Sequence, residues 1–248
     1  MTSISYVTEQ YLQKLRPRSL DDLVGQQRLT QRLKRLVRQV REQHQRFPPV
    51  VLLGDRYVGK VDIASALAHE IAGEQQGRVH LWQGHQLDSA PALEMMLQQV
   101  DRGDAVVVDQ LDVMGAELRA GLVEAAKGAS VSVGSSETGD SDIQISTPAF
   151  SLVGTARPHE FNDADERWNP LQVRDYNTEE LVTLAHCCAR RLDIKVTDSA
   201  AFRLARHSRG YARRLKSMLV EVLLGSVEML SQKDEWRIEE RMVKEVLE

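Results

Sequence analysis

Cysteine is scarce in this chain: its 248 residues contain only two, and they are adjacent, at Cys187 and Cys188. A disulfide between neighbouring residues of a helix would be strained, and adjacent thiols lack the spacing of a metal site. We therefore predict that both are reduced and serve packing. The seven histidines show no metal-ligand spacing either, and no Ser–His–Asp or Cys–His set is recognisable. The residues thus predict neither a bound metal nor a catalytic nucleophile.

Long apolar runs are also missing. No stretch approaches the roughly 18 residues that a membrane span requires. The first residues contain neither a basic segment nor a following apolar one, so no secretory signal is recognisable. We expect a cytoplasmic protein that does not enter a membrane. An apolar content of 42% and a charged content of 27% are typical of a soluble globular protein, and the length suits an α/β domain followed by a smaller helical one.

The net charge of −4 argues against a protein that coats nucleic acid through its overall field, but the charge is uneven. Within Gln26–Arg46 the basic residues are opposed only by Glu42, and apolar residues at helical spacing accompany them. Such a helix could follow the phosphates of DNA. Alternatively it is a solvated face beside an acidic neighbour, which charge alone favours. The basic residues are Arg28, Arg32, Lys34, Arg35, Arg38, Arg41 and Arg46.

The most informative motif is a glycine loop, Gly54–Val61, with the sequence GDRYVGKV. It follows the G-x-x-x-x-G-K-[ST] pattern, in which glycines permit tight turns, backbone N–H groups surround phosphates and the lysine contacts the terminal phosphates. Gly54, Gly59 and Lys60 are present, whereas Val61 stands where a hydroxyl would hold Mg²⁺. The motif predicts a place for a nucleotide, and Val61 argues against Mg²⁺ there.

The elements around this loop suit it. A buried strand at Val50–Leu53 precedes the loop and a helix over Val61–Ala72 follows it, as a phosphate loop requires. A second buried strand, Asp104–Asp109, ends in an aspartate, the usual form of a second motif that holds Mg²⁺. Further along we predict a helix over Glu117–Lys127, a strand at Phe150–Val153 and helices alone from Thr178 onward.

This order predicts an α/β fold in which helices cover both faces of a parallel P-loop sheet over residues 1–177, followed by a small all-helical lid over residues 178–248. Between residues 129 and 146, two alternating segments flank a polar turn and predict a protruding hairpin. The hairpin could dock a partner protein or simply complete the sheet.

With these pieces in order, the chain resembles the RuvB branch of the AAA+ ATPases, the motors of Holliday-junction branch migration. The likeness covers most of the sequence. It rests on the opening segment Leu15–Gln26, the glycine loop, the strand that ends in Asp109, the hairpin, the strand Phe150–Gly154, Tyr176 and the run Ala205–Arg213. The resemblance implies binding of ATP or ADP, assembly into a ring of subunits, and a hairpin that meets RuvA in that family.

The resemblance also implies roles for single residues. Those expected at the nucleotide are Leu15, Arg16 and Val24 in the opening segment, Gly54, Gly59, Lys60, Val61 and Asp62 at the loop, and Tyr176 and Arg213 in the lid. Those expected at the reacting phosphate are Asp109 and Gln110, with Arg167 near an arginine finger that serves the neighbouring subunit.

Each of these assignments has a plainer alternative. Lys60 could be a solvated lysine in a loop that no longer binds phosphate, and Asp109 could cap the following helix instead of holding Mg²⁺. Tyr176 could be a packing residue at the hinge between domains. Arg167 could be an ordinary surface arginine. Its acidic neighbours favour this alternative at least as much as the arginine finger.

The chain departs from the family's pattern where hydrolysis would occur. Val61 and Asp62 replace two hydroxyl residues, and the carboxylates of Asp62 and Asp55 would compete with phosphate for the positive N-terminus of the helix. Tyr57 replaces a glycine, which costs about 1–2 kcal/mol if the backbone there is left-handed. Gln110 replaces the glutamate expected to activate water, and an amide is no base. Binding could survive these changes, whereas turnover should suffer.

Three hypotheses follow for function. The one that we favour is a weakly hydrolysing or non-hydrolysing AAA+ subunit that assembles with a partner protein or with DNA machinery. The second is an active ATP-driven motor of branched DNA, and the third is a DNA-binding adaptor that uses the basic helix without nucleotide. The resemblance also implies a winged-helix DNA-binding domain after the lid, and we expect none among these residues.

Overall fold

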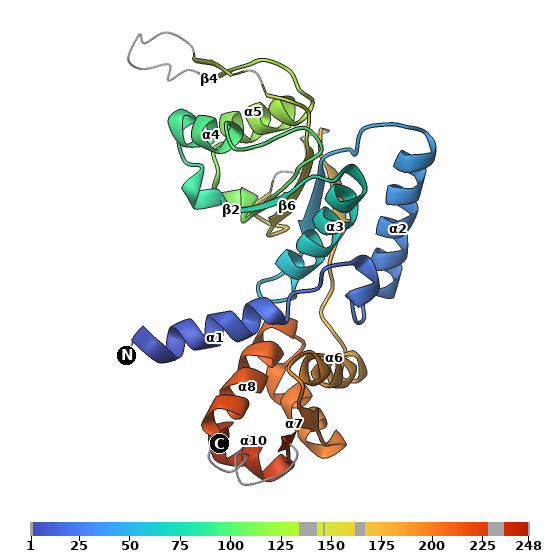
Figure 1. Ribbon diagram of the computed structural model, residues 1–248, viewed down its shortest axis with the longest axis vertical. Helices are drawn as coiled ribbons and strands as arrows, with labels where there is room; N and C mark the ends of the chain where they lie inside the picture. The colour runs from blue at the N-terminus through green and yellow to red at the C-terminus, as the bar shows by residue number, and fades with distance from the viewer. Residues whose placement is uncertain (1, 134–142, 146, 162–166, 228–235, 248) are drawn as a thin grey trace.

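The protein is described by a computed structural model that covers residues 2–133, 143–145, 147–161, 167–227 and 236–247. At its centre lies a five-stranded sheet in the order β2-β3-β6-β1-β7, and every neighbouring pair is parallel (Figure 1). This confirms the predicted α/β class. The strands are β1 (Val50–Leu53), β2 (Val79–Gln83), β3 (Ala105–Asp109), β6 (Ser151–Ala156) and β7 (Asn169–Gln172).

The three inner strands are buried along their whole length. Continuous runs of Val and Leu suit a parallel strand that is covered on both faces. In β1, Val50 and Leu52 pack toward one layer of helices, while Val51 and Leu53 pack toward the other. Because side chains alternate along a strand, one short apolar run serves two separate hydrophobic cores.

Helices cover both faces of the sheet. In Figure 1, α2 and α3 lie on one side of the sheet and α4 and α5 on the other. No helix within the described ranges is long and apolar enough to cross a bilayer. The helices of this part are α2 (Gln27–Glu42), α3 (Lys60–Gln75), α4 (Ala90–Leu97) and α5 (Ala116–Ala126), with single 3-10 turns η1 (Leu20–Asp22), η2 (Gly84–Gln86) and η3 (Leu111–Val113).

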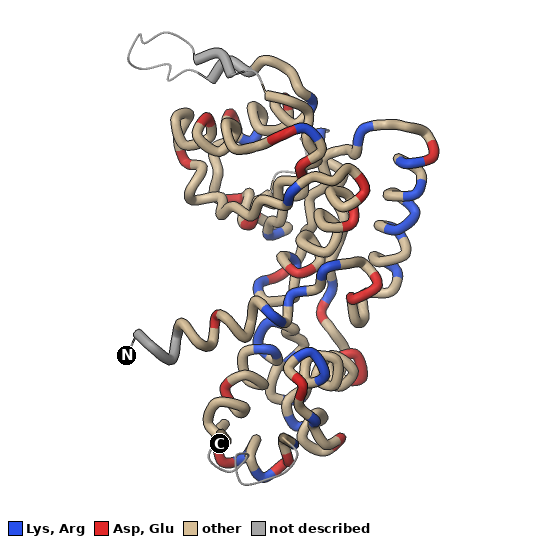
Figure 2. The backbone as a smooth tube through the Cα atoms, viewed as in Figure 1, with Lys and Arg blue, Asp and Glu red and all other residues tan. Residues whose placement is uncertain are grey.

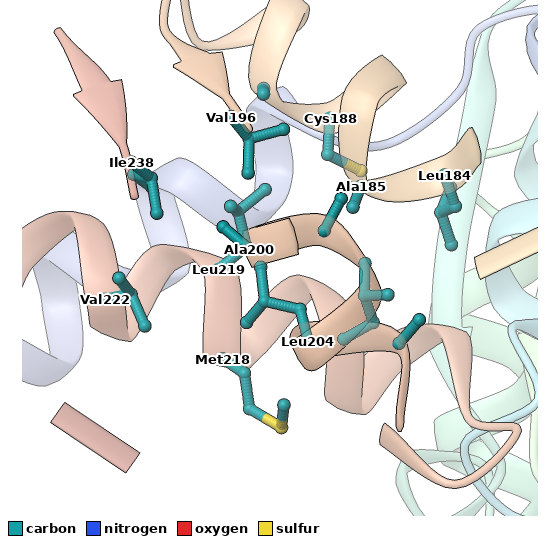
Figure 3. Packing of buried hydrophobic residues seen from close by; sticks show 14 of the residues in the cluster. Leu184, Ala185, Cys188, Val196, Ala200, Leu204, Met218, Leu219, Val222 and Ile238 are labelled. Carbon is teal, nitrogen blue, oxygen red and sulfur yellow. The ribbon is translucent and has the colours of Figure 1, made fainter. Parts of the chain in front are cut away.

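The lid has one apolar core in which helices converge (Figure 3). Asn177 begins its first helix with a capping box, because its side chain accepts the Glu180 N–H at 2.8 Å while the Glu180 carboxylate accepts the Asn177 N–H at 3.0 Å. The lid helices are α6 (Thr178–Arg191), α7 (Asp198–Ser208), α8 (Ala212–Gly225) and α10 (Glu240–Leu247).

The prediction of helices alone after Thr178 is wrong in one detail. Two short strands, β8 (Lys195–Val196) and β9 (Arg237–Ile238), form a parallel ladder within the lid. The apolar residue of each strand lies in the lid core (Figure 3). Two residues per strand are too few to leave a periodic signal in the sequence.

Both cysteines lie in α6. Cys188 is buried, and burial raises the pKa of its thiol to about 11. Cys187 is partly buried, and its sulfur accepts a hydrogen bond from Arg190 Nη2 at 3.1 Å. The two thiols are free, and Cys188 has the predicted packing role.

The predicted hairpin is present as β4 (Val131–Val133) and β5 (Ile143–Ile145), which pair antiparallel. The polar turn between them lies outside the described residues. A helix at the N-terminus, α1 (Thr2–Lys14), was not predicted from the sequence. It packs against the lid through Tyr11 and Leu12 and projects from the body of the molecule (Figure 1).

Asp104 immediately precedes β3, and its side chain links the start of β3 to the start of β2. Its buried carboxylate accepts the backbone N–H of Arg78 at 2.7 Å and of Asp101 at 3.0 Å, and lies 2.7 Å from His80 Nε2. Burial alone would raise the pKa of Asp104, but these donors outweigh burial and hold the pKa below its ordinary value. The ionised group therefore stabilises the fold above the unfolded-state pKa of about 3.9, and this contribution is lost as pH falls through the lower folded-state pKa.

Asp104→Asn is expected to lower the free energy of unfolding by about 1–3 kcal/mol at neutral pH, because buried N–H donors lose a charged acceptor. The difference from wild type should shrink as the pH falls below about 4. Urea denaturation across this pH range measures both effects. Asp101→Asn is the matched control, since that carboxylate is exposed and its pairing with Arg78 should contribute little. An equal loss in both variants would contradict the role of Asp104.

Candidate nucleotide site

A cleft of about 590 Å³ opens at the carboxyl edge of the sheet, between the glycine loop, the ends of β3 and β6, α1 and the first turn of α8. Loops after parallel strands meet at this edge, which is the usual ligand position in such sheets. A second hollow of about 690 Å³, near the other ends of β6 and α3, contains none of the predicted residues. The cleft brings together eight of the thirteen predicted site residues: Arg16, Gly59, Lys60, Val61, Asp62, Asp109, Gln110 and Arg213.

Lys60 is held inside the glycine loop. Its ammonium donates to the carbonyl oxygens of Gly54 and Asp55, both at 2.7 Å. Burial lowers the pKa of Lys60 below its ordinary value, although the nearby carboxylates of Asp109 and Asp112 act in the opposite direction. Lys60 is thus held by the loop instead of being fully solvated, and its contact with phosphate stays a prediction. A phosphate in the cleft would have to draw this ammonium away from the two carbonyls.

Asp62, in the first turn of α3, is paired with the lid. Lys216 Nζ of α8 lies 2.6 Å from Asp62 Oδ2 and also donates to the Leu15 carbonyl at 3.1 Å. The Lys216 side chain is only 8% exposed. One lysine thus joins the phosphate-loop helix, the lid and the opening segment. Asp62 faces an internal cation as well as the positive helix N-terminus.

The loop meets the lid at a second point. Tyr57 has φ 68°, so its backbone is left-handed. The conformational cost expected for a residue other than glycine therefore applies here. The Tyr57 carbonyl accepts the Arg213 N–H at 3.1 Å, and its ring lies edge-on to Tyr211, with 6.3 Å between centroids. Arg213 itself is exposed and lines the cleft, as predicted.

The end of β3 is occupied by internal hydrogen bonds. Asp109 is buried, and its carboxylate accepts the hydroxyl of Thr155 from β6. Gln110 has φ 60°, is exposed, and donates its backbone N–H to the same hydroxyl at 3.2 Å. The residues that precede η3 and α5 are Gln110 and Gly115, so the alternative in which Asp109 caps the next helix is wrong.

Sequence reasoning missed an ion pair beside this group. Arg157, which follows β6, donates through Nε to Asp112 Oδ2 at 3.1 Å and through its backbone N–H to Asp112 Oδ1 at 3.3 Å. The Asp112 side chain is only 1% exposed, and both residues line the cleft. The Arg157 guanidinium, which is also paired with Glu160, lies close enough to Lys60 to help lower the pKa of that lysine.

Comparison with models of protein families shows to which family this chain is related. The model described as the Holliday junction DNA helicase RuvB P-loop domain matches residues 15–163, more than half of the sequence. The chain belongs to the RuvB family. The matched part contains the glycine loop, the Asp109 strand and the hairpin on which the resemblance was based.

Individual RuvB proteins agree with this assignment. A Holliday junction branch migration complex subunit RuvB from Kosmotoga olearia is 28% identical over 219 residues, which are 86% of this chain and 63% of that protein. The RuvB subunit from Salinibacter ruber is 27% identical over 214 residues, which are 83% of this chain and 60% of that protein. The chain thus spans less than two thirds of the length of these relatives.

Solved RuvB structures show the same fold. A mutant of Thermotoga maritima RuvB matches with a TM-score of 0.75 at 24% identity, over 94% of this chain and 72% of that one. The Thermotoga maritima RuvB Holliday junction branch migration motor matches with a TM-score of 0.71 at 22% identity over the same shares. The lid is therefore included in the structural likeness.

Five predicted residues of this RuvB-family chain do not line the cleft. Leu15 and Tyr176 are buried in the lid core, Val24 packs against that core, and Gly54 is buried beside Val173. Burial, with smaller contributions from nearby carboxylates, raises the pKa of the Tyr176 hydroxyl. The hinge-packing alternative for Tyr176 fits this environment. The fifth residue, Arg167, is exposed outside the cleft, so its role as a finger for a neighbouring subunit stays a prediction.

The RuvB cleft suits a nucleotide better than a metal ion. Glycine-loop amides, Lys60 and Arg213 are the groups that could hold phosphates. Toward Mg²⁺, Val61 offers no side-chain oxygen, and one oxygen of the Asp109 carboxylate, Oδ1, accepts the Thr155 hydroxyl. Across the described ranges, no group of three or more His, Cys, Asp or Glu residues has the arrangement of a metal site.

Lys216 is the clearest site residue that was not predicted from the sequence, although its position among apolar residues could have indicated it. It lies on the buried face of α8 among apolar residues, where an unpaired charge would be unfavourable. A lysine at such a position predicts a buried carboxylate partner. The sequence does not say which carboxylate, because Asp62 lies 154 residues away.

Proposed function

We propose that this RuvB-family chain is a subunit that binds adenine nucleotide weakly, does not hydrolyse it, and acts by assembling with a partner in a DNA-processing machine of the cytoplasm. The observation that carries the proposal is the Asp62–Lys216 pair. It supplies, from within the chain, a link between phosphate loop and lid that does not depend on bound nucleotide. The lid position is therefore set mainly by the protein itself.

Three features support weak binding without turnover. Lys60 is engaged by loop carbonyls, so binding must break two hydrogen bonds before it gains new ones. Val61 has no hydroxyl for Mg²⁺. Gln110 cannot act as a base, and a missing general base removes about 10²–10⁴-fold of rate.

Titration calorimetry of ATP and ADP, with Mg²⁺ and separately with EDTA, tests the proposal. We expect micromolar binding that is unchanged by EDTA, because Val61 offers no hydroxyl to the metal. Lys60→Ala should weaken binding at least about 10-fold, since a charge-assisted hydrogen bond contributes about 1.5–3 kcal/mol. Binding that requires Mg²⁺ would overturn the metal-independent part, and no heat from a folded protein would overturn nucleotide binding altogether.

Assembly is supported by family membership. The relatives are described as subunits of the Holliday junction branch migration complex. The hairpin of β4 and β5 is our candidate for contact with a protein partner, and Arg167, which does not line the cleft of its own chain, is our candidate for contact with a neighbouring subunit. We infer that the chain joins a ring or a partner protein. The alternative is an active ATP-driven motor. Measurable ATP hydrolysis by the purified protein would favour that alternative.

A second candidate function is a DNA adaptor that uses α2. Figure 2 shows positively charged residues recurring along this helix. Four exposed arginines, at spacings of three or four residues, share one helix face and make no ion pair within the described residues. The row could follow phosphates, which gives salt-dependent binding. The four are Arg28, Arg32, Arg35 and Arg38. Duplex binding by an Arg32→Ala/Arg35→Ala variant tests this candidate.

A further inference from the structure

A groove of about 500 Å³ lies on the lid, apart from the nucleotide cleft. It is formed by α7, the turn to α8, the first residues of α8 and the start of α10. No residue lines both hollows. Arg213 and Arg214 are consecutive on α8, yet the first lines the cleft and the second lines the groove.

The groove carries a local excess of positive charge. Arg203 is neutralised by Glu240, with Nη2 to Oε1 at 2.6 Å and Nε to Oε1 at 3.0 Å. The guanidinium groups of the other three arginines are exposed and make no ion pair within the parts of the chain that the structure describes. The three are Arg206, Arg209 and Arg214.

Some other arginines of the lid are paired: Arg191 lies 3.3 Å from Asp22, and Arg241 lies 3.1 Å from Glu239. Unpaired guanidinium groups gathered in one hollow repel one another and are best stabilised by an external anion. Their planar donor forks match the oxygens of a phosphate group.

An aromatic ring lies beside these charges. Phe202 lines the groove and is 51% exposed. It precedes Arg206 by one helical turn on α7, so both side chains occupy the same face. Stacking on an exposed ring is how proteins hold unpaired bases, and it is indifferent to base identity.

We propose that this lid groove binds single-stranded nucleic acid, with Arg206, Arg209 and Arg214 on the phosphates and one base against Phe202. An acidic peptide could use the cations, but only a nucleic acid supplies both a phosphate and a flat ring in every unit of its chain. A duplex keeps its bases stacked within the helix, so it cannot use Phe202 in this way. A hollow of this volume accommodates about one nucleotide unit, with the strand continuing along the lid surface.

Fluorescence anisotropy with a labelled oligothymidylate of about 15 nucleotides, a length near the upper site size of single-strand modules, tests the proposal. Arg209→Ala/Arg214→Ala is expected to weaken binding at least about 10-fold and to reduce the slope of log K against log salt by about 1.4, at about 0.7 for each lost single-strand phosphate contact. Phe202→Ala should weaken binding about 5-fold or more through the lost stacking. Arg190→Ala/Arg241→Ala, with the same charge change elsewhere on the lid, should bind as wild type does.

Several outcomes would overturn the proposal. One is unchanged strand affinity in the arginine variant, with circular dichroism showing a folded lid. Another is a duplex that binds as tightly as the single strand and is insensitive to Phe202→Ala, which indicates an unspecific cationic surface. A loss confined to Arg32→Ala/Arg35→Ala would place binding on α2 instead. Because the proposed nucleotide site shares no lining residue with this groove, calorimetry of the same variants separates a failure here from a failure of that site.

Discussion

Purified protein incubated with ATP and Mg²⁺ is expected to release no more phosphate than its Lys60→Ala variant. Val61 has no hydroxyl and Gln110 no carboxylate, at the two positions where the family resemblance implies groups that support turnover. Losing a general base alone lowers a rate by about 10²–10⁴-fold. A coupled phosphate-release assay on both proteins measures the difference.

The matched variant Val61→Thr/Gln110→Glu is expected to gain turnover at least about 100-fold above wild type, because it restores the hydroxyl and the base together. Val61→Thr alone should not, since the base is still missing. Gln110 is exposed and its left-handed backbone suits glutamate no worse than glutamine, so the fold should tolerate this change. Wild-type turnover that Lys60→Ala abolishes would show an active motor and would reject the non-hydrolysing subunit.

Lys216→Met is expected to lower the free energy of unfolding by about 3 kcal/mol. Breaking a buried ion pair by removing one partner leaves the other charge uncompensated and costs about 3–5 kcal/mol. The lower end applies because the Asp62 side chain keeps 21% exposure, against 8% for Lys216. The variant also loses the hydrogen bond to the Leu15 carbonyl. Urea denaturation measures the change.

Replacing both partners shows whether the loss of stability comes from an unpaired charge or from lost side-chain packing. Asp62→Leu/Lys216→Met should recover most of the loss, since apolar residues of similar volume often replace buried ion pairs without cost. Lys127→Met, which removes an exposed partner of Glu124, should change stability by less than about 1 kcal/mol. If Lys216→Met behaved like this surface control, Asp62–Lys216 could not be the link that fixes the lid.

Much of the P-loop part was predictable because its signals are local. The strand Val50–Leu53 has the predicted bounds, and the glycine loop and α3 follow it. A continuous apolar run that enters a glycine turn has few other ways to fold. In contrast, β7, whose four residues include Pro170, was not predicted from the sequence. The proline is tolerated since β7 pairs only with β1, at the edge of the sheet.

The sequence by itself determined the α/β class, the RuvB family and the place of the phosphate loop, because periodicity and motif spacing depend on residues close together in the chain. Only the tertiary structure decided what these residues contact. It paired Asp62 with Lys216, engaged Asp109 with Thr155, and gathered unpaired arginines around an exposed ring on the lid. The partners in the two polar pairs are distant in sequence, and long-range packing alone selects one among the many chemically possible pairings.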